Sequence, residues 1–302
     1  MTERTGGWDA PGFGLAPAAA LVGPFPHRGF LEAWWRHRGA GEPLIVASET
    51  ALVAARRLAE GTVEFMGEPD LTDYHSPLGA DAASLICDLA VTMAPGTRMR
   101  FDSLPEEAAE VVAAGLSRAG VAVRREQHAV AVVLDLPASR EEYLAGLDAK
   151  ERHEVRRKRR RFEAALGPGR LVRGGREGLA AFAAMHRAAA GAKGGFLTGE
   201  LEAFFADLLD LPGAGLDLLV AEDGRPVAGA FGFRDEQAYY LYNSACQPAA
   251  AGASPGVVLV DLRVERASAA GLSLFDFLKV EEPYKYRLGG RARPLFVVEG
   301  VR

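Results

Sequence analysis

Near the end of the chain, a loop gathers ionisable side chains directly after an apolar segment. The segment SLFDFLKVEEPYKYRLGG (273–290) begins with Leu274, Phe275 and Phe277 around Asp276, which predicts a mostly buried strand. The loop that follows presents two carboxylates, two phenols and two cations: Glu281, Glu282, Tyr284, Lys285, Tyr286 and Arg287. Side chains of these types exchange protons and bind charged groups. The loop is therefore a candidate site of chemistry.

A simpler interpretation of the same loop stays open. Pro283 marks a turn, so Glu281 and Glu282 would be solvated, with Lys285 and Arg287 as their surface ion pairs. Exposed pairs of this kind contribute only about 0–1 kcal/mol. The two tyrosines would then pack with their hydroxyls at the surface.

A second charged feature is a basic helix predicted at DAKERHEVRRKRRRFE (148–163), within a longer helix expected over about 139–166. An apolar side at helical spacing is predicted to be buried: Leu144, Leu147, Val155, Phe162 and Leu166. The rest of the circumference presents cations, among which Arg156, Arg157 and Arg160 are candidate contacts for phosphate or RNA. The surface is either simply solvated or a docking surface for phosphate on a cofactor, a nucleic acid or an anionic lipid.

Strands alternate with helices along the chain, which indicates a layered α/β architecture. Residues 216–245 are expected to form three strands, followed by a helix from Ser254 and the strand LSLFDF. Ser254 is the expected N-cap and Pro255 the first helical residue. A helix that begins just beyond a strand offers backbone N–H groups to a phosphate, and Gly256 lets the phosphate approach. The same residues also suit an ordinary helix cap.

Composition narrows the class of protein. Of 302 residues, 49% are hydrophobic and 25% charged, as in soluble globular proteins, and the net charge of −5 argues against general nucleic-acid binding. Cys87 and Cys246 lie in no metal-binding or disulfide pattern, so we expect no metal site and a reducing, cytoplasmic location. We also expect no transmembrane span and no signal peptide.

Histidines supply the remaining candidates. His75 in the loop DYHSPLG, with Asp73 and Tyr74, is a candidate for an acceptor pocket between the two halves of the chain. His186 and Lys193 are further substrate-binding candidates, the latter in GAKGGFLTG, which is either a lid or a plain connector. A lone loop histidine is as readily an ordinary hydrogen-bonded residue.

Two segments carry a resemblance to a known family. YYLYNSACQPAAAGASPGVVLVDLRVERASAAGLSLFDFLKVEEPYKYRLGG and LDAKERHEVRRKRRRFE resemble GNAT-type acyltransferases of the cellulose-biosynthesis-associated group. In that group, a basic K-x-R-x-x-x-R-R helix precedes a Y-Y-L…SPG…DF…EPYK…G block. The resemblance covers most of the C-terminal half, whereas the N-terminal half matches only in layout. The usual pyrophosphate loop, Q/R-x-x-G-x-G/A, is incomplete: QPAAAGASPG (247–256) is its nearest counterpart.

The resemblance implies an α/β, tandem GNAT-like fold with two mixed sheets flanked by helices, as in Fem-type aminoacyl transferases. Residues 1–28 would be an irregular lead-in, residues 29–137 an N-terminal GNAT-like unit, and residues 138–302 a C-terminal GNAT unit. The N-terminal unit would complete the acceptor cleft, while donor and chemistry would lie in the C-terminal unit.

The resemblance also implies roles for the site residues. The acyl-pantetheine arm would lie between the strand before the SPG helix and LSLFDF, in a donor site of Tyr242, Asn243, Ser254, Gly256, Val257 and Asp276. Glu282 or Glu281 would take the proton of the nucleophile, and Tyr284 or Tyr242 would protonate the leaving thiolate. Lys285 would bind donor phosphate or acceptor carboxylate, and a backbone N–H of YYLYNS would stabilise the oxyanion.

The expected function is acyl transfer from acyl-CoA to an amine or hydroxyl of a small molecule, sugar or peptide, without a metal. One alternative is a Fem-type transferase that uses aminoacyl-tRNA, in which the basic helix would grip RNA phosphates. Another is a GNAT-shaped binding module without catalysis. Homodimerisation stays open, because GNAT units dimerise in several ways.

Overall fold

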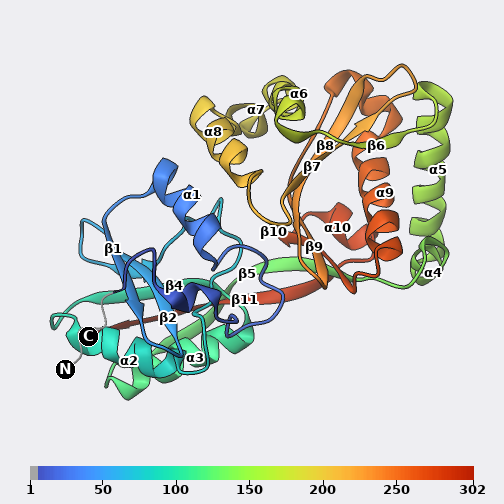
Figure 1. The fold of residues 1–302 in the computed structure, drawn as a ribbon. Coiled ribbons are helices and arrows are strands. Elements are labelled where there is room, and N and C mark those ends of the chain that lie inside the picture. The colour runs from blue at the N-terminus through green and yellow to red at the C-terminus, as the bar shows by residue number, and fades with distance from the viewer. Residues whose placement is uncertain (1–5) are drawn as a thin grey trace. The chain divides into compact units, whose positions relative to one another are not determined.

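The computed structural model describes residues 6–302, apart from the side chains of Ala192 and Lys193. The chain divides into two compact units, one up to Ala131 together with Arg293–Arg302, and the other Val132–Ala292. Each combines a mixed sheet with helices (Figure 1), so the predicted α/β class with flanking helices is confirmed. In the described residues, no helix is sufficiently long and apolar to cross a membrane.

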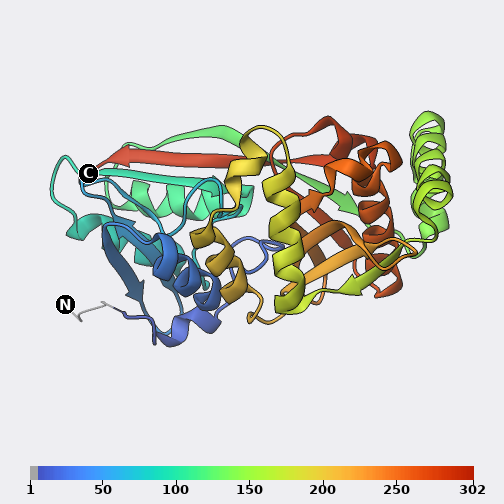
Figure 2. The same cartoon turned by 90° about the horizontal axis from the view of Figure 1, so that it is seen from above.

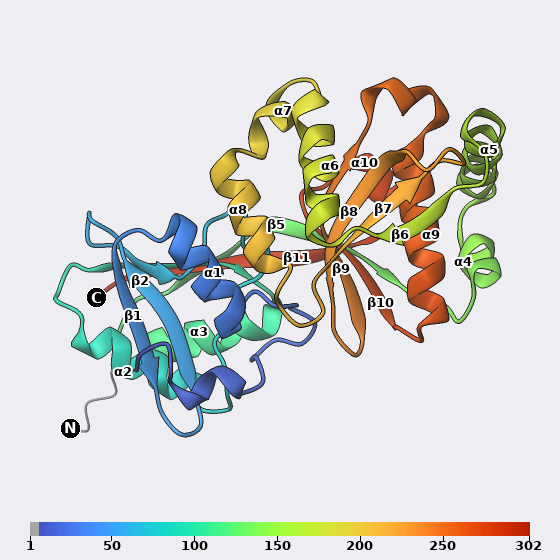
Figure 3. The same ribbon diagram turned by 45° about the horizontal axis from the view of Figure 1, so that its top comes forward.

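The first unit holds five strands and three α-helices, and the last strand of the chain returns to it. Its sheet runs in the order β1-β2-β3-β4-β11, with β5 next to β11. Helices α2 and α3 pack against each other, α2 against β2 and α3 against β4 (Figure 3). The elements are η1 (Pro11–Gly14), α1 (Arg28–Arg38), β1 (Glu42–Ala47), β2 (Leu52–Arg57), β3 (Val63–Phe65), α2 (Ala82–Thr92), β4 (Arg98–Leu104), α3 (Glu106–Arg118), β5 (Arg124–Asp135) and β11 (Arg291–Val301).

The second unit holds the strands that were expected around the chemistry. From β10 its sheet runs β10-β9-β8-β7-β6, with β9 and β10 parallel and the other neighbours antiparallel. The elements are α4 (Arg140–Gly146), α5 (Ala149–Leu166), β6 (Arg170–Arg173), α6 (Gly175–Ala188), α7 (Ala192–Phe196), α8 (Gly199–Leu208), β7 (Gly215–Val220), β8 (Pro226–Arg234), β9 (Ala238–Cys246), η2 (Pro248–Ala253), α9 (Pro255–Ala269), β10 (Leu274–Lys279) and α10 (Pro283–Arg287).

Alternation along β8 separates the two faces of this sheet. Ala228 and Ala230 belong to the core cluster that contains the apolar side of α9, whereas Gly229 and Phe231 contact Phe182 of α6 and Phe205 of α8. Successive side chains of a strand point to opposite faces. Helix α9 therefore covers one face and α6 with α8 the other, and α5 packs on the outer side of α9 (Figure 2).

The predicted helix over 139–166 is wrong in one respect, because it is two helices. Ser139 caps α4 by accepting a hydrogen bond from the Glu142 N–H, and the backbone is extended at Leu147 before α5 begins after Asp148. Leu144, Leu147, Val155 and Phe162 are buried as predicted, and Leu166 is half-buried. The break lets both short α4 and long α5 place apolar side chains in the same core.

A buried carboxylate fixes the basic helix to α9. Asp261 of α9 is 1% exposed and accepts hydrogen bonds from Arg140 Nη2 at 2.7 Å, Arg140 Nε at 3.1 Å and Arg159 Nη1 at 3.1 Å. A buried charge is tolerated only where partners replace its hydration. Part of the cationic surplus of α5 is therefore structural and is not available to a ligand.

Replacement of Asp261 by Ala should destabilise the protein by about 2–3 kcal/mol, because it leaves two half-buried guanidinium groups without their carboxylate. Urea unfolding would measure the loss. The control is Glu163→Ala, which removes a surface carboxylate 3.4 Å from the same Arg159 and should cost less than about 1 kcal/mol. Equal losses in the two variants would contradict the role assigned to Asp261.

Candidate active site

Strands β9 and β10 pair with each other only over the first part of their length. Their parallel pairing runs only through Leu274, Phe275 and Asp276, opposite Ala238, Tyr239 and Tyr240. In the described chain no register pair joins them beyond this point, although β9 continues to Cys246 and β10 to Lys279. Beyond this point the main-chain groups of the two strands are not paired with one another in the sheet.

A bulge in β9 lies where the pairing has ended. Asn243 pairs with Phe231 and Leu241 with Gly232, so Tyr242 is an extra residue. Its ring lies among Phe205, Phe231 and Phe233, at centroid distances of 5.3–6.1 Å. A bulge redirects the local main-chain groups, and the aromatic packing holds it in place.

The end of β10 is a strained turn. Leu278 and Val280 have φ of 59° and 74°, which L-residues rarely adopt and a β-branched valine least of all. Two buried charged side chains hold this turn: Asp276, fully buried, accepts the Leu278 N–H at 2.7 Å, and the Lys285 ammonium donates to the carbonyls of Phe277, Leu278 and Lys279 at 2.7–3.2 Å.

These contacts bear on two sequence-based assignments. The three N–H groups of Lys285 all reach backbone carbonyls and the side chain is 4% exposed, so the turn engages its charge. The Asp276 side chain accepts a hydrogen bond from the same turn. The predicted ligand contacts of both residues stay predictions.

The turn leads into the short helix α10, which carries Tyr284. Burial raises the pKa of Tyr284, and the charge and hydrogen bond of Glu282 raise it further. The phenol therefore stays protonated, as a proton donor must. Glu282 is exposed at the N-cap of α10, and its predicted role as the base stays a prediction. Glu281 instead accepts the hydroxyl of the exposed Tyr286 at the surface.

Helix α9 begins beside Tyr284. Its N-cap is Ser254, as predicted, with left-handed φ and ψ of 58° and 47°, although the side chain makes no capping hydrogen bond. Pro255 is the first helical residue as predicted. A side chain at Gly256 would lie 3.2 Å from Cys246 Sγ, so glycine keeps the end of β9 close to this helix start.

A pocket of about 460 Å³, here called the transfer pocket, joins these elements to the basic helix. It is lined by Tyr284, Arg287 and Leu288, by Val257 of α9, and by one face of α5: Lys150, Glu151, His153, Glu154, Val155 and Lys158. Arg157 holds the pKa of Glu154 down at about 2, so this carboxylate is charged. The volume is within the range of small-molecule sites.

The cations predicted to contact phosphate or RNA lie on a different part of α5 from those that line the transfer pocket, and their contact stays a prediction. Arg156, Arg157 and Arg160 are exposed but do not line the transfer pocket, and Arg157 is paired with Glu154 at 2.7 Å. The cations that do line it are Lys150, Lys158 and Arg287, with His153. The helical spacing could have indicated which side chains of α5 line the pocket, since residues 150, 154 and 158 share a face with the buried Val155.

The histidine candidates have local partners. His186, 1% exposed, is hydrogen-bonded through Nε2 to Asn243 Oδ1 at 2.8 Å, which ties α6 to β9 next to the bulge. Its predicted substrate contact stays a prediction, as does the donor contact of Asn243. The side chain of Lys193 lies outside the described residues.

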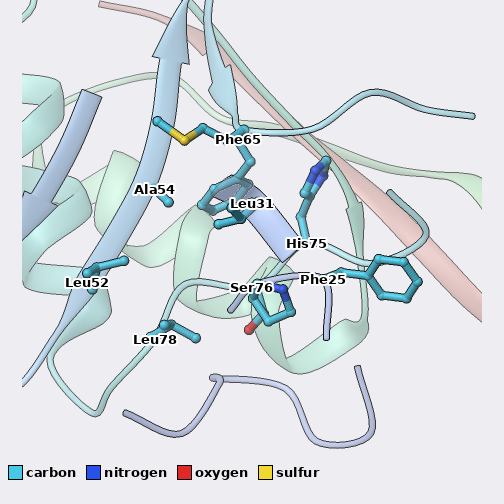
Figure 4. Close-up of a pocket in the computed structure, with 10 residues that line it drawn as sticks. Phe25, Leu31, Leu52, Ala54, Phe65, His75, Ser76 and Leu78 are labelled. Carbon is cyan, nitrogen blue, oxygen red and sulfur yellow. The ribbon is translucent and has the colours of Figure 1, made fainter. Parts of the chain in front are cut away.

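In the first unit, Tyr74 is fully buried beneath the guanidinium of Arg293, and His75 is hydrogen-bonded through Nδ1 to the Asp102 carbonyl at 2.9 Å. The adjoining pocket, between Phe65, Ser76 and Leu78, measures only about 10 Å³ (Figure 4), room for about one water molecule. This pocket is too small for an acceptor molecule. The acceptor roles of Asp73, Tyr74 and His75 stay predictions.

Comparison with known proteins adds family and fold. Residues 149–286 match the family described as acetyltransferase (GNAT) domain, and no curated protein sequence matches the chain. The structure is similar to that of FemX, with a TM-score of 0.66, 12% identity and coverage of 94% of this chain and 93% of that one. It is also similar to that of L-PGS from Bacillus licheniformis, with a TM-score of 0.60, 13% identity and coverage of 92% of each chain.

A third similar structure is the C-terminal domain of a putative lysylphosphatidylglycerol synthetase from Agrobacterium fabrum, with a TM-score of 0.59, 13% identity and coverage of 88% and 86%. At these identities the likeness concerns the fold. The matched residues 149–286 contain α5, the strands β9 and β10, the start of α9 and Tyr284. The match of this segment to an acetyltransferase (GNAT) domain supports an acyltransferase.

Replacement of Lys285 by Met should destabilise the protein by about 2–4 kcal/mol, because three carbonyls at a strained turn lose their donor. Chemical unfolding would measure this loss. Arg287→Met, on the exposed side of α10, is the matched control and should cost less than about 1 kcal/mol. A Lys285→Met protein as stable as the parent would refute the positioning role.

Proposed function

We propose that the protein transfers an acyl group from an acyl-CoA thioester to an amine or hydroxyl, with the chemistry at the opening between β9 and β10. The observation that carries the proposal is the end of strand pairing at Tyr240 and Asp276, next to the start of α9 and to Tyr284. A pantetheine arm is a linear amide chain, and unpaired main chain suits its hydrogen bonds.

The phosphates of the donor would lie in the transfer pocket. Lys150, Lys158 and Arg287 supply positive charge there, and Val257 brings the first turn of α9 to the same space. The N-terminal N–H groups of a helix and its dipole favour an anion. The acyl thioester would then point towards Tyr284 and the bulge at Tyr242.

The transfer itself needs two proton movements and one stabilised oxyanion. Glu282 takes a proton from the attacking amine, the new C–N bond forms, and the thioester oxygen becomes an oxyanion that a main-chain N–H of the bulge stabilises. The C–S bond then breaks, and Tyr284 donates its proton to the thiolate. Contact between Glu282 and the Tyr284 hydroxyl lets the first proton restore the phenol.

A second candidate is an aminoacyl transferase that uses aminoacyl-tRNA. It is favoured by the fold shared with FemX and by the exposed arginines of α5 that the transfer pocket leaves unused, Arg156 and Arg160. RNA held by such a surface binds in a strongly salt-dependent way. Membership of the cellulose-biosynthesis-associated group stays a prediction, since the matched family is the general domain.

Thermal unfolding in the presence of acetyl-CoA, longer acyl-CoAs, free CoA and bulk tRNA tests the donor class. A donor at about 100 times its Kd adds roughly 2.7 kcal/mol of stability, so the melting midpoint should rise with an acyl-CoA. A rise with tRNA alone, lost between about 50 and 200 mM salt, would instead favour aminoacyl-tRNA. Lys158→Gln should weaken acyl-CoA binding, whereas Arg160→Gln should not.

Tyr284→Phe should lower kcat by about 10²–10⁴-fold with little change in the donor Kd, because only the proton of the phenol is lost. Tyr286→Phe, an exposed tyrosine of the same helix, is the control and should keep full activity. Release of the CoA thiol measures turnover.

The pH dependence of kcat should reflect the phenol of Tyr284. Its pKa is raised, so the protonated form that donates persists above the ordinary tyrosine value of about 10. The alkaline decline of kcat due to this group should therefore start above pH about 10. A decline centred at or below that value, absent in Tyr284→Phe, would contradict the assignment of its environment.

A further inference from the structure

A second pocket lies at the other end of α9. It measures about 300 Å³, is here called the arginine pocket, and is bounded by the starts of β7 and β9, the ends of β6 and β8, and the last turns of α9. Its charged lining consists of four arginines and one carboxylate: Arg173, Arg234, Arg263, Arg266 and Asp217. None of these residues lines the transfer pocket.

The interior of the arginine pocket is built from buried polar groups. Asp217 and Arg263 are 3% and 7% exposed, and Arg263 Nη1 donates to Asp217 Oδ2 at 2.5 Å. Arg266 Nη1 donates to the other carboxylate oxygen at 3.0 Å. The one carboxylate is therefore already shared by two guanidinium groups, which leaves the pocket with an excess of positive charge.

Two donors in this interior are not used by the protein. Among the described residues, Arg263 Nε is buried without an acceptor, and the buried Tyr239 hydroxyl donates its proton to no acceptor. Arg263 stacks on the Tyr239 ring, 3.9 Å from its centroid, so both groups are held rigidly. A buried donor without an acceptor costs about 1–3 kcal/mol, and an oxyanion within the pocket would remove that cost.

Two glycines make room for side chains that line the pocket. A side-chain carbon at Gly232 would lie 2.3 Å from the Tyr239 hydroxyl, and one at Gly215 would lie 2.1 Å from Arg173 Nη1. Arg173, Arg234 and Arg266 are exposed and lie around the buried groups. A cavity with buried donors inside and cations at its mouth is complementary to a small anion of high charge density.

We propose that the arginine pocket is a second ligand site, separate from the transfer pocket, which binds a phosphate group, either as inorganic phosphate or on a small phosphate monoester. The dianion matches the excess of positive charge better than a single carboxylate does. Guanidinium groups bind phosphate in a bidentate manner. Tyr239 donates to the same anion, since burial raises its pKa and keeps the phenol protonated.

Calorimetric titration of the whole protein with inorganic phosphate, and separately with glycerol phosphate, tests this site at constant ionic strength. We expect one phosphate per chain, with at least tenfold weaker binding in Arg234→Gln and in Tyr239→Phe. Stronger binding of the monoester would identify a phosphorylated metabolite as the ligand, and equal binding would identify free phosphate. Parallel titrations with sodium sulfate and sodium chloride show whether the pocket binds any anion or selects phosphate.

Controls separate the two pockets and the fold. Lys158→Gln, in the transfer pocket, and Arg118→Gln, an exposed arginine of α3, remove the same charge and should leave phosphate binding unchanged. Melting midpoints without phosphate show whether each variant is folded. The proposal is overturned if phosphate does not bind, or if binding is lost in Lys158→Gln and kept in Arg234→Gln.

Discussion

The site depends on one buried cation. The Lys285 ammonium gathers three successive carbonyls at the end of β10, while Asp276 takes the N–H of Leu278. Without these contacts the backbone at Leu278 and Val280 would relax from its positive φ. The turn would then no longer direct α10 and Tyr284 towards the start of α9. A charged residue that the sequence places among the catalytic candidates is thus held by the main chain of the turn.

Helix α9 connects the elements of the second unit. Its first turn borders the transfer pocket, its middle carries the buried Asp261 that binds Arg140 and Arg159, and its last turns bring Arg263 and Arg266 to Asp217. The buried carboxylates Asp261 of α9 and Asp217 of β7 therefore neutralise arginines from several elements. The strong basic character of α5 is in part the counterpart of the buried Asp261, which binds Arg159.

Glycines and a bulge provide the openings. Gly256 allows Cys246 to approach α9, and Gly232 allows the Tyr239 hydroxyl to lie against the sheet. The extra residue Tyr242 interrupts the regular pairing of β8 with β9 at the point where β9 has also left β10. The pairing of β8 with β9 is therefore irregular at one place, while the aromatic cluster around Tyr242 maintains the packing there.

The sequence by itself determined the α/β class, the three strands of residues 216–245, the helix that starts at Pro255, and the identity of the loop that carries Glu282 and Tyr284, because these follow from local periodicity and turn residues. It did not determine the break at Leu147, the return of β11, the burial of Lys285, or the face of α5 that meets the transfer pocket. Those features depend on contacts between residues distant in the chain, such as Arg140 and Arg159 with Asp261 or Arg263 with Asp217. A charged side chain has the same letter whether it is solvated, ligand-binding or buried in the turn of a strand, so only the tertiary structure decided between these roles.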